Sequence, residues 1–231
     1  MKRKFIPLTK PYLGKEEEKA VINSLRRMDL SADGYYSKKL TSVLSSFLHV
    51  SSVFLTPSCS LALELAIKAL GIGKGDEVII PSFTFTATAN VVMNAGAKVV
   101  FAEIDKHSFA LDYTLLEKRI TKRTKAIIYV WYGGWCDHIR EIMTIAKKHK
   151  IPVIEDAACA LGVKDGNAYA GTFGDIGCFS FHVTKKVVCG EGGYWLQNEK
   201  TLLLRLISYE IMGLTGQRFL WEKLHRMNGL E

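Results

Sequence analysis

Short apolar runs rich in β-branched residues recur along the chain from about residue 50 onward. They occupy residues 53–56, 77–80, 98–104, 126–131, 152–155, 178–182 and 193–197. Their apolar residues are continuous and do not alternate with polar ones, which indicates strands that are buried on both faces. Strands of this kind are typical of a parallel sheet that is covered by helices on each side.

Segments with helical periodicity lie before and between these runs. They cover residues 15–27, 36–48, 60–70, 138–148 and 201–212. In the third of them, Glu64 and Lys68 are four positions apart on an otherwise apolar helix, where their side chains can pair. The alternation predicts an α/β layered domain with a mostly parallel sheet. The sequence ends at HRMNGLE without the glycine, proline or polar segment that usually closes a unit, so we expect a truncated chain.

Composition and charge narrow the class of protein. A chain of 231 residues that is 48% hydrophobic can bury one sizeable core. The net charge of +8 is scattered, with small basic groups at 2–4, 121–125 and 146–150 that lack interleaved aromatic residues. This distribution favours solvated faces, with attraction of a small anionic substrate as a lesser alternative, over binding to nucleic acid.

The cysteines and the longest apolar segments indicate where such a protein works. Five cysteines form no C-x-x-C pair and have no metal-ligand spacing, which favours a reducing cytoplasm and no metal site. The N-terminus lacks the apolar core of a signal peptide. No apolar stretch approaches the roughly 20 residues that span a membrane, so no membrane association is expected.

Candidate chemistry lies just after the predicted strands, because ligands of open α/β sheets bind beyond the carboxyl ends of strands. After residues 53–56, PSCS leads into a helix whose first N–H groups, with the Ser60 hydroxyl, suit a phosphate. Ser60 as a helix N-cap is the competing interpretation, and locally the favoured one. After residues 77–80, Phe83 and Phe85 could stack on a planar ring, although core packing is the commoner role of such residues.

Two later strand ends add a carboxylate and a lysine. Asp156 ends the run PVIED, where it could hold a protonated ring nitrogen or cap a helix. Ser180 could supply a second hydroxyl to a phosphate, and a lysine just past this strand could form a Schiff base with an aldehyde cofactor. The adjacent pair Lys185 and Lys186 would by itself be assigned to the surface. The order of these signals along one α/β domain is more specific than any of them alone.

The stretches LTPSCSLALELA, GDEVIIPSFTFTATAN, GAKVVFAEID, VIEDAA and GCFSFHVTK followed by GEGG closely resemble the DegT/DnrJ/EryC1/StrS family of sugar-nucleotide aminotransferases. Within that family the resemblance is to the dTDP-4-amino-4,6-dideoxygalactose transaminase group. It implies the large domain of a fold type I, aspartate aminotransferase-like enzyme that uses pyridoxal 5′-phosphate (PLP). Residues 1–231 would form this domain, with an N-terminal helical arm over about 1–50 and truncation before a small C-terminal domain.

The resemblance also implies roles for single residues. Lys185 would be the Schiff-base lysine and proton shuttle, and Asp156 would pair with the pyridine nitrogen. Lys186 would be a neighbour without a covalent role. The remaining cofactor contacts would come from Cys59, Ser60 and Ser180 at the phosphate, Phe85 against the ring, and Cys159 where relatives place glutamine or histidine near the 3-hydroxyl.

The implied reaction transfers an amino group, usually from glutamate, to a keto-sugar attached to a nucleoside diphosphate. The implied assembly is a homodimer with shared active sites. Some positions depart from the family's pattern. Cysteine is a poor hydrogen-bond donor at 159, Trp131 replaces a histidine, and WEKLHRMNGLE lacks about three residues of the pattern, including an asparagine. The alternative is therefore a truncated, catalytically impaired homologue that folds and keeps the cofactor without turnover.

Overall fold

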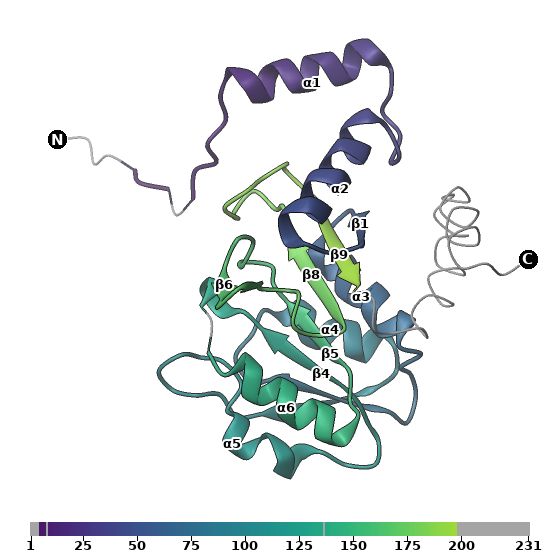
Figure 1. Ribbon diagram of the computed structural model, residues 1–231, viewed down its shortest axis with the longest axis vertical. Helices are drawn as coiled ribbons and strands as arrows, with labels where there is room; N and C mark the ends of the chain where they lie inside the picture. The colour runs from purple at the N-terminus through teal and green to yellow at the C-terminus, as the bar shows by residue number, and fades with distance from the viewer. Residues whose placement is uncertain (1–4, 8, 136, 198–231) are drawn as a thin grey trace, which may run out of the picture.

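The computed structural model describes residues 5–7, 9–135 and 137–197. Its centre is a seven-stranded sheet in the order β1-β9-β8-β5-β4-β2-β3, with helices on both sides (Figure 1). The strands are β1 (Ser52–Thr56), β2 (Glu77–Pro81), β3 (Lys98–Ala102), β4 (Thr124–Val130), β5 (Val153–Asp156), β8 (Ile176–Ser180) and β9 (Gly193–Gln197). Strand β9 is antiparallel to β1 and β8, and the other neighbours pair in parallel. The predicted α/β fold with a mostly parallel sheet is confirmed.

The core lies on both faces of this sheet because alternate residues of each strand point to opposite sides. Ile79 and Ile127 belong to one buried cluster, which also holds residues of helices α2 (Tyr35–Leu48) and α6 (Ile139–His149). Ile80 and Ile128 belong to the other cluster. That cluster includes residues of α3 (Cys59–Ala69) and α4 (Thr86–Asn94). Strands β2, β5, β8 and β9 are buried along their whole length, as their continuous apolar runs predicted.

Sequence patterns missed the smaller elements. The helix α4 was not expected, because its sequence TATANVVMN is rich in threonine and valine, which are poor helix formers. The short hairpin of β6 (Lys164–Asp165) and β7 (Ala168–Tyr169) was also missed. The same holds for α5 (Tyr113–Leu116) and for the 3₁₀ turns η1 (Glu117–Arg119) and η2 (Tyr132–Gly134). These elements are too short to carry a periodic pattern.

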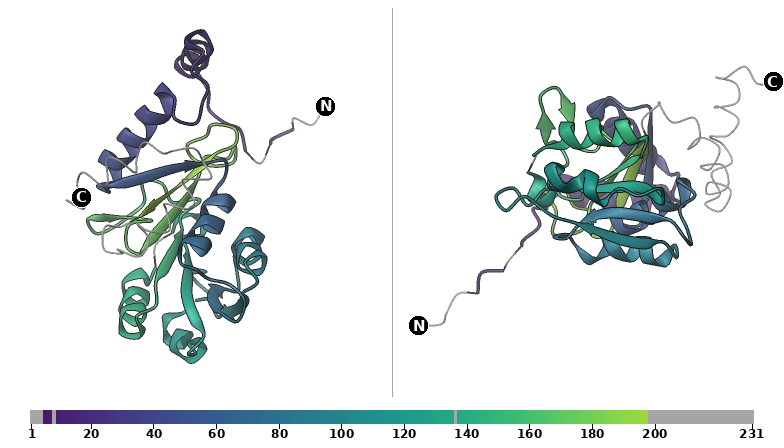
Figure 2. Two further views of the ribbon diagram at one scale, coloured as in Figure 1. Left: turned by 90° about the vertical axis from the view of Figure 1, so that its right-hand side faces the viewer. Right: turned by 90° about the horizontal axis from the view of Figure 1, so that it is seen from below.

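The N-terminal arm has two helices with different relations to the sheet. Helix α2 packs through the buried Leu44 and Leu48, whereas α1 (Lys15–Arg27) has no buried residue. Figures 1 and 2 show α1 projecting beyond the helices that cover the sheet. None of the helices in the described ranges is long and apolar enough to cross a membrane. The predicted helix at 201–212, the WEKLHRMNGLE segment and Cys136 lie outside the described residues.

Candidate functional site

The predicted site residues lie where β1, β2, β5 and β8 end, and the antiparallel β9 begins at the same edge of the sheet. Thr56, Gly193 and Ser180 form one row across β1, β9 and β8. A Cβ atom on Gly193 would lie 2.6 Å from the backbone nitrogen of Cys59. Glycine at this position therefore lets the start of α3 approach the sheet closely, which brings its first N–H groups to the edge that carries Ser180.

The N-cap of helix α3 is Ser58, which the sequence did not indicate. Ser58 Oγ accepts a hydrogen bond of 3.2 Å from Leu61 N, and Ser58 has the extended backbone of an N-cap. The favoured assignment of Ser60 as the cap is therefore wrong, because α3 begins at Cys59 and the earlier of two suitable hydroxyls takes this position. Ser60 lies exposed in the first turn, where an anion can meet both its hydroxyl and the helix N-terminus.

Asp156 is a buried carboxylate on the site side of β5, with only 6% of its surface exposed. Its oxygens accept hydrogen bonds from Thr88 Oγ1 at 3.1 Å and from Ala158 N at 3.2 Å, and Cys59 Sγ lies 3.9 Å away. The residues that follow form turns, so the N-cap alternative is wrong. Burial raises the pKa of Asp156, and the nearby Lys185 partly offsets this effect. Within the described ranges no basic side chain forms an ion pair with Asp156, which leaves it able to receive a cation.

The two adjacent lysines separate in the structure. Lys185 is half-buried, and its Nζ lies 3.2 Å from Cys159 Sγ. Lys186 is exposed, so the surface assignment is right for Lys186 and wrong for Lys185. The turn between β8 and the lysines is fixed by hydrogen bonds from His182 N to Ser180 Oγ and from Lys185 N to His182 O.

Phe83 and Phe85 do not pack in the core. Their side chains are 42% and 73% exposed, because both follow β2 at the point where the chain leaves the sheet. Phe85 is the N-cap residue of α4. With Ser60 it lines a pocket of about 490 Å³ between the starts of α3 and α4. The structure therefore brings Ser60 and Phe85 to one pocket, whose lining does not include Asp156, Ser180 or Lys185. Asp156 instead contacts Cys59, the first residue of α3.

Cys59 has a contact that sequence reasoning missed. Its thiol points toward Asp156 Oδ1 and is buried, and burial raises the thiol pKa well above its ordinary value. A neutral thiol beside a carboxylate is a weak hydrogen-bond donor rather than a nucleophile.

Glu155 is the second polar group that sequence reasoning left without a role. It is fully buried and accepts hydrogen bonds from the Trp131 indole and from the backbone N–H groups of Gly171, Phe173 and Gly174, at 2.5 to 2.8 Å. Burial raises its pKa to about 7, against the lowering effect of these four donors. Only the adjacency of two acidic residues on an apolar strand could have indicated it. Glu155 therefore fixes the turn at 171–174.

A larger cavity of about 1550 Å³ lies at the other end of the sheet. It is lined by residues such as Lys125 and Pro152 beside the amino ends of β4 and β5, so it does not adjoin Lys185. Among the residues that the structure places, no group of three or more histidine, cysteine or acidic side chains could hold a metal ion.

Comparison with known proteins adds information that the geometry alone does not supply. The profile of the DegT/DnrJ/EryC1/StrS aminotransferase family matches residues 11–230. GDP-perosamine synthase of Escherichia coli O157:H7 is 37% identical over 219 residues, which cover 94% of this chain and 60% of the relative. UDP-N-acetyl-3-dehydro-alpha-D-glucosamine 3-aminotransferase of Acidithiobacillus ferrooxidans is 48% identical over 133 residues, covering 57% of this chain and 36% of the relative.

The fold has solved counterparts. The PLP-form of Spr1654 from Streptococcus pneumoniae superimposes with a TM-score of 0.80 at 31% identity, covering 86% of this chain and 54% of that one. A second structure of Spr1654 is its PMP-form. The chain thus spans about three-fifths or less of the length of these relatives.

Proposed function

Because the chain belongs to the DegT/DnrJ/EryC1/StrS aminotransferase family, we propose that it takes part in PLP-dependent amino transfer to a nucleoside-diphosphate keto-sugar. Glutamate is the proposed amino donor, and surface polysaccharide or deoxysugar biosynthesis is the proposed context. The names of two relatives, which act on GDP- and UDP-linked sugars, support this class of substrate. A homodimer in the cytoplasm is the proposed assembly and location.

One observation carries the proposal. The buried carboxylate of Asp156 ends β5, and the half-buried amine of Lys185 lies 3.2 Å from the Sγ of Cys159, three residues further along the chain. A carboxylate at this position suits a protonated pyridine nitrogen, and an amine suits an aldehyde. The residues present therefore fit PLP, which when bound supplies a ring that withdraws electrons from the reacting carbon.

In this proposal each side chain has one task. Asp156 would keep the ring nitrogen protonated, and Lys185 Nζ would hold the cofactor and serve as the amine that takes up and returns the proton. The phosphate would be held by the first N–H groups of α3, including that of Cys59, with the hydroxyls of Ser60 and Ser180. Residues 1–231 would thus form the cofactor-binding domain, with the arm at about 1–50.

Two further side chains complete the proposed cofactor site. Phe85 would cover one face of the ring, since it lines the same pocket as Ser60. Cys159 would stand near the 3-hydroxyl, beside Lys185. Because a thiol donates a hydrogen bond poorly, this contact favours a second candidate function, a subunit that keeps the cofactor without turnover.

The test is the visible absorbance of the covalent lysine–cofactor adduct after PLP is added to the purified chain. Lys185→Ala is expected to abolish this band, whereas the matched neighbour variant Lys186→Ala is expected to retain it. A band that persists in Lys185→Ala would refute the assignment. Adding glutamate then separates the two candidates, because amino transfer replaces the band with that of the amine form of the cofactor, and binding without turnover leaves it unchanged.

A further inference from the structure

Three exposed aromatic rings meet beyond the carboxyl ends of β2, β3 and β4, at the same edge of the sheet as Asp156 and Ser180. We call Phe83, Phe109 and Tyr132 the aromatic cluster. Their ring centroids lie 5.3 Å apart for Phe83 and Phe109, 4.6 Å for Phe83 and Tyr132, and 6.0 Å for Phe109 and Tyr132. Each side chain is 41% or 42% exposed. The rings follow the ends of β2, β3 and β4, so three separate segments converge on one patch of ring faces.

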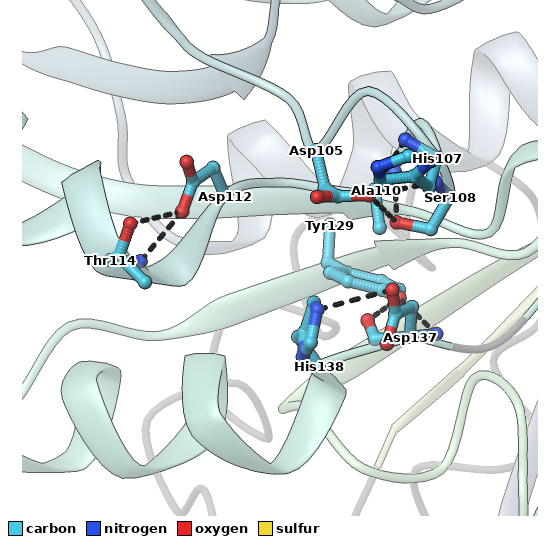
Figure 3. A network of polar contacts seen from close by, with 9 residues as sticks. All are labelled: Asp105, His107, Ser108, Ala110, Asp112, Thr114, Tyr129, Asp137 and His138. Carbon is cyan, nitrogen blue, oxygen red and sulfur yellow. Dashed lines mark hydrogen bonds and ion pairs between the residues drawn. The ribbon is translucent and has the colours of Figure 1, made fainter.

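The loop that carries Phe109 is held by hydrogen bonds to Asp105. Phe109 has φ of 60°, a left-handed backbone that is unfavourable for a bulky residue, and it lies between the buried Ser108 and Ala110. Asp105 Oδ1 accepts hydrogen bonds from His107 N at 2.8 Å and from Ser108 N at 2.9 Å (Figure 3). Phe109 N donates a hydrogen bond to Asp105 O. The Phe109 ring is thus presented at the surface by a strained backbone. Backbone strain of this kind clusters at functional positions.

The segment after Tyr132 is fixed as well. Tyr129 Oη donates a hydrogen bond of 2.6 Å to the carbonyl oxygen of Asp137, and the imidazole of His138 lies 3.1 Å from the Asp137 carboxylate (Figure 3). The His138 ring also packs on Tyr113, with 4.7 Å between centroids. Because Tyr113 begins α5, this contact ties the segment to the chain that follows the Phe109 loop.

The aromatic cluster adjoins the lysine pair through the turn η2. Tyr132 begins this turn and Gly134 ends it. A Cβ atom on Gly134 would lie 2.7 Å from the Cys159 carbonyl oxygen and 3.3 Å from Lys186 Nζ. The exposed ammonium of Lys186 therefore rests against the turn that carries Tyr132. Lys185 Nζ lies 3.2 Å from the sulfur of the same Cys159.

We propose that the aromatic cluster and Lys186 form the subsite for the nucleoside diphosphate part of the substrate. The nucleobase stacks on the exposed ring faces, and the Lys186 ammonium pairs with the diphosphate. This inference rests on the proposed function, because it assigns the sugar end of the same molecule to Lys185. A nucleoside diphosphate has a planar base next to a doubly charged diphosphate, which matches an aromatic cluster next to the Lys186 ammonium. A purely apolar partner surface would leave this ammonium without a counter-charge.

The experiment is calorimetric titration of the PLP-treated full chain with UDP, GDP and uridine. Base stacking on an aromatic residue is lost on its truncation, so Phe109→Ala is expected to weaken binding of UDP and GDP roughly tenfold. Phe109→Leu keeps the apolar volume without the ring face and is expected to weaken binding as well. Phe101→Ala is the matched control, since Phe101 is 53% exposed on β3 and outside the cluster, and it is expected to leave binding unchanged.

Lys186→Gln tests the diphosphate contact. It is expected to weaken UDP several-fold and to leave uridine unchanged, because uridine has no charge to pair. Equal dissociation constants for the native chain and both Phe109 variants, or no binding of either diphosphate, would overturn the proposal. The proposal would also be overturned if Phe109→Ala changed the sedimentation coefficient but left UDP binding unchanged. That result would mean that Phe109 contacts a second copy of the chain. The adduct band measured on the same samples reports the proposed function separately, since a chain can keep this band and still fail to bind UDP.

Discussion

Two neighbouring carboxylates at the end of β5 have opposite surroundings, because successive side chains of a strand point to opposite faces. Glu155 faces four N–H donors, which occupy both of its oxygens. Asp156 faces one hydroxyl, one backbone N–H and a distant thiol. The first carboxylate therefore belongs to the packing of the turn at 171–174, and the second keeps acceptor capacity for a ligand.

Glu155→Gln is expected to lower the free energy of unfolding by roughly 2–6 kcal/mol although the two side chains have the same shape. An amide group places an NH₂ where two N–H donors now point, which leaves two buried donors without acceptors at about 1–3 kcal/mol each. Urea denaturation measures the change. Glu103→Gln is the control, since Glu103 is an exposed partner of Arg119, and it should change stability by less than about 1 kcal/mol. A small effect at Glu155 would contradict the assigned hydrogen bonds.

Sequence reasoning predicted part of the residue-scale arrangement. The distinction between Lys185 and Lys186 came from the family resemblance, and the structure places the two side chains in different environments. The sequence could not distinguish Ser58 from Ser60 as the N-cap, because the predicted start of this helix is uncertain by about two residues and either hydroxyl could cap it. The donors to Glu155 come from residues 171–174, which lie far along the chain and carry no local signal.

At the scale of elements, Glu77 joins the amino ends of three adjacent strands. It begins β2 and is 2% exposed. Its carboxylate accepts hydrogen bonds from Thr121 Oγ1 at 2.6 Å and Arg123 Nη2 at 2.7 Å, both beside β4, and from Lys98 Nζ of β3 at 3.3 Å. The Thr121 hydroxyl, with the two cations, holds the pKa of Glu77 below its usual 4.5.

This lowered pKa predicts a dependence of stability on pH. The folded chain binds the proton of Glu77 less readily than the unfolded chain does, so the contribution of Glu77 is complete above about pH 4.5. It is lost as the pH falls through the lower pKa of the folded state. Glu77→Gln is therefore expected to flatten the fall of the urea midpoint on acidification. If Glu77→Gln and the native chain lost stability in parallel below pH 4.5, Glu77 would not be the group that titrates.

The elements were predictable to the extent that their sequences are periodic. The continuous apolar runs of β2, β5 and β8 predicted buried strands, with ends that differ by one or two residues from those observed. The sequence of β9 does not indicate its antiparallel direction, because a buried strand has the same continuous apolar pattern in either direction. Its partners β1 and β8 decide its direction.

At the scale of the whole molecule, the sheet with its two buried clusters forms the body, and α1 lies outside it (Figure 1). Helix α2 lies between them and contributes Leu44 and Leu48 to the cluster that includes Ile79. Helix α1 keeps Val21 and Leu25 exposed at 61% and 58%. The stability of the body should therefore be independent of α1.

A pair of identical substitutions tests this division. Leu44→Ala removes a side chain that is 5% exposed and leaves a cavity, so it is expected to lower the free energy of unfolding by about 2–4 kcal/mol. Leu25→Ala removes the same atoms from an exposed position and is expected to change it by less than about 0.5 kcal/mol. Both values come from urea denaturation of the full chain monitored by tryptophan fluorescence. Because the deleted atoms are the same, the difference in free energy of unfolding between the two variants measures the effect of burial. A loss of stability in Leu25→Ala as large as that in Leu44→Ala would mean that α1 packs against another surface in solution.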